Sequence, residues 1–369
     1  MKSFAESRPS PHRGTSPSCA RLFRVAALFL ALAATGASAQ DTRRLLDLAG
    51  EWKFEAGDNM RWAAPGFDDR SWDSIHAPGA WEDQGYPGYD GYAWYRKHFT
   101  APAGINGRML LLRLGAIDDA DEVYLNGTFV GFTGLFPPSF VTAYNQGREY
   151  QIPAWLLKQG GDNVVAVRVY DDQMAGGITH GDLGIYEVLD PPYPDVSLDG
   201  MWKLRIGDSL SWSEAAFDDS HWESAYVPAY WETQGHKGYD GPGWYRLHVN
   251  VPEKLVDQRL LLLLGRIDDF DETYLNGQRI GRTGSIPSRL QPGRLYSQYR
   301  ELRAYTIPMG LLRPGPGNVI AVRVFDNWLH GGIYRGPVGF ISRERWNRWR
   351  GSHRQDRDFL GNLKDFFLN

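Results

Sequence analysis

The feature of this sequence that most limits its fold is an internal repeat with a period of about 150 residues. Twelve of 19 residues are identical between 78–96 and 228–246, and 14 of 18 are identical between 110–127 and 260–277. Solenoid repeats recur every ~20–50 residues, whereas a period near 150 matches a whole domain. The chain is therefore predicted to contain two copies of one domain.

The repeat also locates a loop whose length differs between the copies. Equivalent residues lie 150 positions apart up to Gly134 and Gly284, but segments 163–169 and 318–324 lie 155 positions apart. The second copy thus carries five extra residues before Tyr299. Because insertions are tolerated in surface loops, segments 135–143 and 285–298 are predicted to form loops that differ between copies. If these loops line a binding face, the copies will prefer different ligands.

The first 40 residues have the layout of a secretory signal. Arg21 and Arg24 precede an apolar run at 25–34, and small residues follow up to Ala39. A membrane-spanning helix needs about 20 apolar residues, about twice the length of this run. We therefore expect cleavage near Ala39 and a periplasmic or secreted protein. Cys19, the single cysteine, precedes that point, so the mature chain would form no disulfide.

Domain boundaries follow from the repeat and from a proline-rich segment at 190–194. Clustered prolines favour a short, stiff linker. We expect a signal peptide at 1–40, domain one at 41–190, domain two at 191–342 and a tail at 343–369.

The pattern within each copy is typical of a β-sandwich. Apolar runs of strand length occur at 109–114 and 260–264, and residues 122–125 lead into Asn126-Gly127, which favours a hairpin. Valines alternate with other residues along 165–169, as in a strand with one inward face. Helical segments are few and short. We predict an all-β fold of two tandem jelly-roll sandwiches with a short C-terminal helix.

The motifs in these segments resemble those of a known family. The string LGAIDDADEVYLNG at 114–127, its repeat LGRIDDFDETYLNG at 264–277, and the WYR strands ending at Arg96 and Arg246 are similar to the sugar-binding jelly roll of family-two glycoside hydrolases, a galactose-binding-domain-like fold. They are equally similar to the module inserted in sialate O-acetylesterases. The resemblance covers nearly all of 45–342. It implies carbohydrate as the ligand, but a fold does not determine an activity.

No catalytic residue is predicted. In family-two enzymes the catalytic glutamates lie in a separate barrel, which takes about 250 residues, and the two copies leave no room for one in 369 residues. The net charge of −4 provides no basic surface for nucleic acid. The nine histidines are dispersed, which argues against a zinc site.

Two groups of residues in each copy are candidates for binding a sugar. Sugar recognition needs an aromatic face for the apolar side of a pyranose and polar groups for its hydroxyls. The first group is Trp81, Tyr89, Asp90 and Trp94, repeated as Trp231, Tyr239, Asp240 and Trp244. The second follows a late strand and comprises Asp171, Asp172, Gln173 and His180, with Asp326, Asn327, Trp328 and His330 in the second copy. The alternatives are that the tryptophans belong to the core and that the polar residues cap the end of the sandwich. Paired glycines in this second region would let the backbone approach a ligand.

An acidic cluster in each copy offers a further interpretation. Asp118, Asp119 and Asp121 precede Glu122, and Asp268, Asp269 and Asp271 precede Glu272. Carboxylate oxygens are preferred ligands of Ca²⁺, and paired carboxylates hydrolyse glycosides. Only alternate members of a strand point to one face. The alternative is a turn with a carboxylate paired to Arg96 or Arg168. No cofactor is predicted, with Ca²⁺ at this cluster as the alternative.

The tail begins with basic residues and two tryptophans, Trp346 and Trp349. Apolar residues then recur at helical spacing, at Phe359, Leu360, Leu363, Phe366 and Phe367. Such an amphipathic helix docks on its own domain, on a protein partner or on a membrane surface.

Three functions are consistent with these patterns. The first is an exported carbohydrate-binding protein whose two linked modules gain avidity and which has no catalytic domain. The second is an accessory part or remnant of a glycosidase of the β-galactosidase or β-glucuronidase type, or of a carbohydrate acetylesterase. The third is a periplasmic sensor or protein-interaction module.

Overall fold

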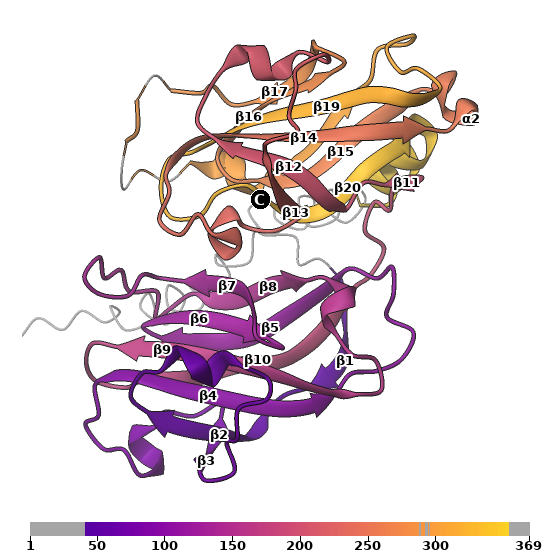
Figure 1. The fold of residues 1–369 in the computed structure, drawn as a ribbon. Helices are drawn as coiled ribbons and strands as arrows, with labels where there is room; N and C mark the ends of the chain where they lie inside the picture. The colour runs from indigo at the N-terminus through magenta and orange to yellow at the C-terminus, as the bar shows by residue number, and fades with distance from the viewer. Residues whose placement is uncertain (1–40, 288, 292–293, 295, 354–369) are drawn as a thin grey trace, which may run out of the picture. The chain divides into compact units, whose positions relative to one another are not determined.

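The computed structural model describes residues 41–287, 289–291, 294 and 296–353, and within them the chain folds into four β-sheets. The sheets form two sandwiches, which we call module one (β1–β10) and module two (β11–β20) (Figure 1). The prediction of an all-β fold with two tandem sandwiches is confirmed. The predicted signal segment 1–40 and the apolar tail residues from Phe359 to Phe367 lie outside the described residues.

Module one contains a six-stranded and a four-stranded sheet. The six-stranded sheet has the order β3 (Asp73–Ala77), β2 (Gly50–Ala56), β4 (Gly91–Thr100), β9 (Asp162–Asp171), β6 (Ala120–Leu125) and β7 (Thr128–Thr133). The four-stranded sheet has the order β1 (Thr42–Asp47), β10 (Gly177–Val188), β5 (Leu110–Asp118) and β8 (Gly147–Ile152). Neighbouring strands are antiparallel throughout.

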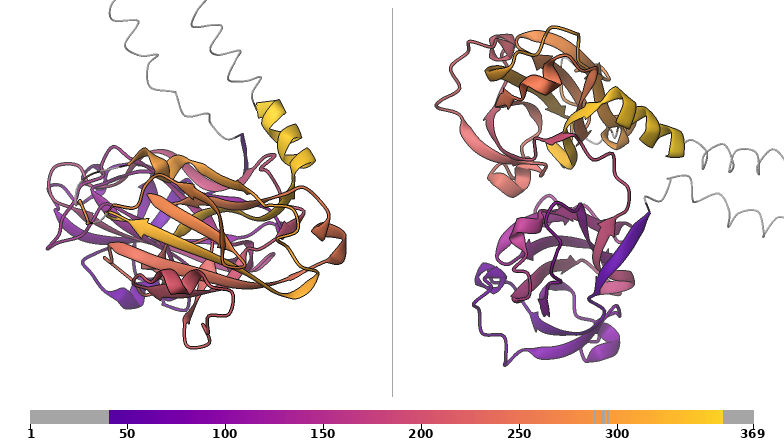
Figure 2. Two further views of the ribbon diagram at one scale, coloured as in Figure 1. Left: turned by 90° about the horizontal axis from the view of Figure 1, so that it is seen from above. Right: turned by 90° about the vertical axis from the view of Figure 1, so that its right-hand side faces the viewer.

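Module two repeats this topology strand for strand. Its six-stranded sheet has the order β13 (Glu223–Val227), β12 (Gly200–Ile206), β14 (Gly241–Val251), β19 (Gly315–Asp326), β16 (Phe270–Leu275) and β17 (Gln278–Thr283). Its four-stranded sheet has the order β11 (Val196–Ser197), β20 (Ile333–Ser342), β15 (Leu260–Ile267) and β18 (Leu302–Thr306). The two facing layers of each module are visible in Figure 2.

Asn-Gly turns close equivalent hairpins in the two modules. Asn126 and Gly127 have φ angles of 51° and 82° between β6 and β7, and Asn276 and Gly277 have 50° and 83° between β16 and β17. Two consecutive residues with positive φ form the turn type that matches the twist of a β-hairpin, and Asn and Gly tolerate it best. The turn predicted from Asn126-Gly127 is present in both modules.

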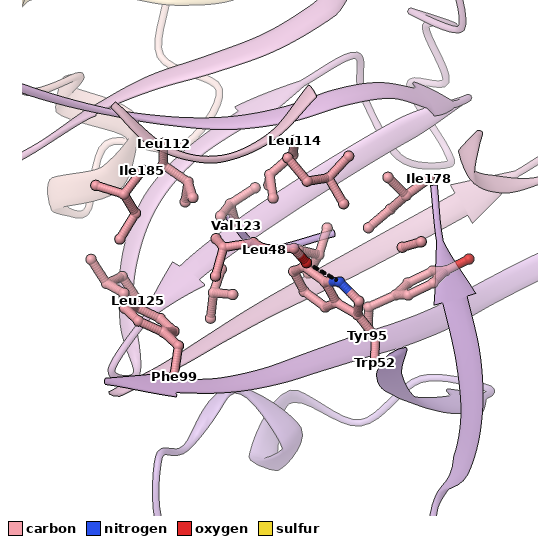
Figure 3. Packing of buried hydrophobic residues seen from close by; sticks show 14 of the residues in the cluster. Leu48, Trp52, Tyr95, Phe99, Leu112, Leu114, Val123, Leu125, Ile178 and Ile185 are labelled. Carbon is pink, nitrogen blue, oxygen red and sulfur yellow. Dashed lines mark hydrogen bonds between the residues drawn. The ribbon is translucent and has the colours of Figure 1, made fainter. Parts of the chain in front are cut away.

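Each module has its own apolar core between its sheets. In module one Trp52 and Tyr95 of the six-stranded sheet face Leu112 and Leu114 of the four-stranded sheet (Figure 3). Trp52 donates its indole N–H to the carbonyl of Leu48 at 2.8 Å, which satisfies the ring's polar atom inside the core. The equivalent bond in module two joins Trp202 to Leu198 at 2.9 Å.

The outer face of each six-stranded sheet is also covered, because the chain between its first strands folds over it. This segment includes the 3-10 helix η1 (Met60–Ala63) in module one. Arg96 of β4 is fully buried and binds the Asp69 carboxylate at 2.7 Å and the carbonyl of Ala64 at 3.1 Å. In module two Arg246 binds Asp219 at 2.7 Å.

The remaining helices are short connections and one C-terminal helix. The connections are η2 (Glu82–Gln84), η3 (Ala154–Leu156), η4 (Leu210–Ser213), η5 (Trp231–Gln234), α2 (Glu253–Val256) and η6 (Ser297–Arg300). Residues 343–353 are helical, and Trp346 packs on Leu261, Leu263 and Ile341 of module two. This part of the tail therefore contacts its own domain. Among the described residues, none of the helices is both long enough and apolar enough to span a membrane.

Candidate functional site

Carboxylates from distant parts of the sequence gather at one end of module one. The register pairs Gly91 at the start of β4 with Asp171 at the end of β9, and Gly177 at the start of β10 with Asp118 at the end of β5. These pairings place Asp118 and Asp171 at the same end of the sandwich. Asp118, Asp119 and Asp171 each offer a carboxylate oxygen, and these oxygens lie within 4.8 Å of one another.

Asp171 is the least compensated member of this set. Its side chain is 0% exposed, and neither carboxylate oxygen has a hydrogen-bond partner. Burial, followed by the charges of Asp118 and Asp119, raises the pKa of Asp171 to about 8. Burial and a hydrogen bond with Asp119 raise the pKa of Asp118 to about 7. Burying a carboxylate without a partner is costly, so this end of the module favours a bound proton or a bound cation.

Asp119 connects this cluster to the neighbouring loops. One of its carboxylate oxygens accepts a hydrogen bond from the Thr142 hydroxyl, and the other accepts one from the Asp172 backbone N–H at 3.0 Å. Thr142 belongs to the loop between β7 and β8, and Asp172 follows β9. The carboxylate of Asp119 therefore holds two loops in place.

Arg148, which is itself fully buried, carries a positive charge that partly opposes this rise in the pKa of Asp118. Its Nε donates to Asp121 at 2.6 Å, its Nη1 to the carbonyl of Ala143 at 2.6 Å, and its Nη2 to the carbonyl of Asp119 at 3.0 Å. Since each of its nitrogens donates elsewhere, Arg148 makes no direct pair with the carboxylates of Asp118 and Asp171.

The Ca²⁺ candidates predicted from the sequence divide into two kinds. Asp121 is bound by Arg148 and by the Tyr150 hydroxyl, both at 2.6 Å. Asp271 is bound by Arg303 at 2.9 Å and by Tyr305 at 2.8 Å. These two aspartates form buried ion pairs, so assigning them to a cation site is wrong. Strand alternation turns Asp121 and Asp271 to the opposite face from Glu122 and Glu272.

The outer face of β6 carries another of the acidic residues. Glu122 pairs with Arg168 at 3.1 Å, and Glu272 pairs with Arg323 at 2.9 Å. The pair of Glu122 and Arg168 therefore matches the alternative interpretation of the acidic motif, in which one of its carboxylates binds Arg168.

Module two repeats the acidic end with different hydrogen bonding. Five acidic positions recur: Glu82, Asp90, Asp118, Asp119 and Asp171 correspond to Glu232, Asp240, Asp268, Asp269 and Asp326. Burial, followed by the charges of Asp268, Glu232 and Asp240, raises the pKa of Asp326 to about 10. One oxygen of Asp326 accepts a bond from the Trp328 N–H at 2.9 Å, while its other oxygen is buried without a partner, and Asp268 accepts a bond from the Asp269 N–H at 2.9 Å. Within the described part of the chain, the close set of three carboxylates is found in module one.

The loop insertion explains another difference between the modules. Asn327 is 0% exposed, and its side-chain oxygen accepts from the Gln291 N–H at 2.7 Å. Its amide nitrogen donates to the carbonyls of Gln291 and Arg294 at 2.7 and 2.9 Å. Asp172, its equivalent in module one, is exposed. The longer loop is thus fastened to position 327 in module two, whereas position 172 faces solvent in module one.

The predicted stacking role of the four tryptophans is wrong. Trp81, Trp94, Trp231 and Trp244 are all 0% exposed. Trp81 packs against Phe54 in the core and donates to the carbonyl of Tyr89 at 3.0 Å. Trp94 lies on the outer face of β4, where Trp62 and Tyr124 cover it and Asp58 accepts its indole N–H at 3.1 Å. None of these rings presents a face to a ligand from solvent.

The paired glycines have a packing role. A Cβ on Gly176 would lie 2.2 Å from the Trp81 ring, and one on Gly331 would lie 2.0 Å from Trp231. Glycine is therefore required for the backbone to approach the buried indole. The sequence suggested that these glycines let the backbone approach a ligand, but in the structure they let the backbone approach a buried tryptophan.

Other predicted residues serve the turn before β4 and β14. The Tyr89 hydroxyl donates to the carbonyl of Tyr92 at 2.6 Å, and Tyr239 donates to that of Pro242 at 2.9 Å. Asp90 is exposed at this turn, and Asp240 is half-buried.

The remaining candidates lie near the ends of β9 and β19. Asp172, Gln173 and His180 are exposed in module one. Trp328 and His330 are half-buried in module two, where the His330 ring lies 4.9 Å from that of Tyr230.

Sequence reasoning missed an aromatic surface beside the acidic end of module one. Its rings are Tyr92, Phe136, Phe140 and Tyr170, all partly exposed. Tyr92 lies 4.8 Å from Tyr170 and 5.4 Å from Phe136, and Phe140 lies 5.4 Å from Tyr170. The Arg168 guanidinium lies over Tyr92 at 4.7 Å, and the Tyr170 hydroxyl donates to Asp172 at 3.4 Å. We call these four rings the aromatic surface.

Two signals in the sequence point to this surface. Tyr92 and Tyr170 directly precede or follow core-facing strand residues, so their side chains point outward. Phe136 and Phe140 lie in the loop that differs between the copies. In module two Pro242 and Phe325 occupy the paired positions of Tyr92 and Tyr170, and Phe325 is only 6% exposed. The open aromatic surface is thus a feature of module one.

Comparison with known proteins agrees with the resemblance to glycoside hydrolase domains that the sequence motifs indicated. Residues 57–175 match the family model for the second all-β domain of β-galactosidase. A β-galactosidase of Bacteroides ovatus is 27% identical over 168 residues, which are 42% of this chain and 18% of the relative. An α-L-rhamnosidase of Streptomyces avermitilis is 27% identical over 301 residues, which are 77% of this chain and 25% of the relative.

Solved structures include a β-glucuronidase of Bacteroides uniformis with 18% identity and a TM-score of 0.34, covering 77% of this chain and 27% of that one. The chain spans between 13% and 25% of the length of the curated relatives. The modules are sandwich domains like those of family-two glycoside hydrolases. The matched segment 57–175 contains the acidic end and the aromatic surface of module one.

Proposed function

We propose that this chain is a carbohydrate-binding protein and that module one binds the sugar on its aromatic surface. The observation that carries the proposal is the group of four partly exposed rings beside exposed polar side chains. Aromatic rings stack on the apolar face of a pyranose, and carboxylate or amide groups bind its hydroxyls. Asp172 and Gln173 provide such groups next to Tyr170. The relatives are glycoside hydrolases, which supports carbohydrate as the ligand.

The position of the carboxylates favours binding over hydrolysis. Glycoside hydrolysis needs two carboxyl groups that both reach the scissile bond. Asp171 is 0% and Asp119 is 7% exposed, so a glycan approaching from solvent does not reach both. We therefore propose an accessory role, in which this chain holds a carbohydrate and a separate hydrolase cleaves it.

The two modules have unequal roles in this proposal. Module two has Pro242 and the buried Phe325 where module one has the partly exposed Tyr92 and Tyr170. Sugar binding is therefore assigned to module one, and the avidity expected from two equal sites is not part of the proposal.

Retention on insoluble polysaccharides, followed by a glycan array, tests this function. Tyr170→Ala is expected to weaken binding about tenfold, because stacking of an aromatic ring contributes ~0.5–1.5 kcal/mol beyond the area it buries. The matched control is Trp155→Ala, since Trp155 is 62% exposed on η3, next to the opposite end of β9. The control should bind like the wild type.

Two results would count against the proposal. One is a wild-type protein that no polysaccharide or glycan retains, and the other is a Tyr170→Ala variant that binds as well as the control. Turnover of nitrophenyl glycosides or nitrophenyl acetate by the pure protein would refute the accessory role.

A further inference from the structure

Module one contains a buried carboxylate whose hydrogen-bonding capacity is unmet. Both oxygens of Asp171 are buried without a partner, and the side chain is 0% exposed. Buried polar atoms in folded proteins nearly always have a partner. An unmet group of this kind therefore points to a ligand that completes it.

The surroundings of Asp171 determine the chemistry of that ligand. Asp118 and Asp119 bring their oxygens within 4.8 Å of those of Asp171, and the charges of Glu82 and Asp90 act on the same group. The donor set consists of carboxylate oxygens without histidine or cysteine, which suits a hard cation rather than zinc or copper. Arg148 donates its N–H groups to other acceptors and leaves the cluster without a direct cationic partner.

We propose that module one binds one divalent cation, Ca²⁺, between Asp118, Asp119 and Asp171. Ca²⁺ accepts six to eight oxygen ligands in flexible geometry, whereas Mg²⁺ demands a regular octahedron and keeps several waters. Three convergent carboxylates, one of them fully buried, match the first preference better.

Module two shows what the same position does without the cation. Asp326 already accepts the Trp328 N–H, and Asp268 already accepts the Asp269 N–H. Asp326 keeps one buried oxygen without a partner, but among the described residues the set of three carboxylates with oxygens within 4.8 Å of one another lies in module one. The chain is therefore expected to bind one Ca²⁺ rather than two.

The bound cation would fasten the ends of β5 and β9 to each other. Asp118 ends β5, Asp171 ends β9, and Asp119 holds the Thr142 hydroxyl and the Asp172 N–H. The loop that contains Thr142 also carries Phe136 and Phe140. Ca²⁺ would therefore order one side of the aromatic surface, but the cation site itself does not depend on sugar binding.

Titration calorimetry of the full chain, freed of metal with EDTA and then titrated with CaCl2 or MgCl2, tests the proposal. We expect one Ca²⁺ per chain and Mg²⁺ binding at least tenfold weaker. Asp171→Asn should weaken Ca²⁺ binding at least a hundredfold. Asp326→Asn, the matched change in module two, should bind Ca²⁺ like the wild type.

Thermal unfolding distinguishes loss of the site from loss of the fold. Asp171→Asn replaces a buried carboxyl by a neutral amide of the same shape, so in EDTA it should unfold close to the temperature of the wild type. Added Ca²⁺ should raise the unfolding temperature of the wild type and of Asp326→Asn, but not that of Asp171→Asn.

The proposal is overturned if millimolar CaCl2 produces neither binding heat nor a rise in unfolding temperature, if two ions bind per chain, or if Asp326→Asn loses Ca²⁺ while Asp171→Asn keeps it. Ca²⁺ binding without retention on any polysaccharide would uphold this site and refute the proposed function. Retention without Ca²⁺ binding would do the reverse.

Discussion

Two aspartates of module one, Asp121 and Asp171, show how partners decide the role of a buried residue. Asp121 is 1% exposed and is bound by a guanidinium and a tyrosine hydroxyl. Asp171 is 0% exposed and has no partner for either oxygen. A buried ion pair whose hydrogen bonds are satisfied belongs to the fold, whereas an uncompensated carboxylate requires a proton or a cation. The two residues therefore have different roles although both are aspartates at the end of one sandwich.

The equivalent aspartate of module two predicts a pH dependence of stability. Asp326 has a pKa of about 10 in the folded chain, raised by burial and by Asp268, Glu232 and Asp240. An unfolded aspartate titrates near ~3.9. Between these values the folded chain binds a proton that the unfolded chain does not. The free energy of unfolding should therefore fall as pH rises from about 4 towards 10, by at most about 1.4 kcal/mol per pH unit from this group.

Asp326→Asn should remove much of this decline, because an amide stays neutral at every pH. Urea unfolding of the wild type and the variant at pH 5, 7 and 9 measures the effect. The variant should gain stability over the wild type as pH rises. Equal slopes for the two proteins would contradict a protonated Asp326.

At the scale of the element, the connections between strands differ more than the strands do. The strand order is the same in both modules, yet the loop after β7 presents Phe136 and Phe140, whereas the longer loop after β17 is fastened to Asn327.

The covering segment, which is the chain between β2 and β3 that lies over the outer face of β4, has a stabilising role. Arg96 crosses from β4 into it and binds Asp69 and backbone carbonyls. Arg96 thus joins the strand to its covering segment, together with Trp94, which bonds to Asp58, and His98, which bonds to Asp69.

Removing that side chain should destabilise module one. Arg96→Met leaves the buried Asp69 with His98 as its remaining side-chain partner, so the loss should lie towards the lower end of the ~3–5 kcal/mol that breaking a buried pair costs. Chemical denaturation followed by tryptophan fluorescence measures the loss. Arg246→Met should produce a similar loss in module two, because its pair with Asp219 is equivalent.

Arg70→Met is the control, since Arg70 is 88% exposed in its pair with Asp68. Exposed ion pairs contribute little, so this variant should unfold like the wild type. An Arg96→Met protein as stable as the control would show that the buried pair is not needed.

At the scale of the whole molecule, the sequence predicts an exported protein. Expressed with its own N-terminus in a bacterial host, the chain should be recovered outside the cytoplasm with Gln40 as its first residue, because Ala37–Ala39 offer the small residues that a signal peptidase requires. Mass spectrometry of the fractionated cells measures this. A full-length chain confined to the cytoplasm would contradict export.

The residue order alone was enough to predict the duplication, several strands, the Asn126-Gly127 turn and the inward face of Val165, Val167 and Val169, because hydrophobic period and turn chemistry are local properties. The sequence also identified the acidic motif as a candidate cation site. It did not determine which acidic residues pair with arginine, since Arg148, the partner of Asp121, comes from a different strand, and nothing local distinguishes Asp121 from the unpartnered Asp171.

Only the tertiary structure decided which aromatic residues face solvent. Tyr92 and Trp94 lie two residues apart on the same outer face of β4, so alternation treats them alike. Trp62 of the covering segment packs on Trp94 and buries it, whereas Tyr92 lies beyond that segment and stays partly exposed. Whether an outward residue is covered depends on the path of a distant segment of the chain, which no local pattern encodes.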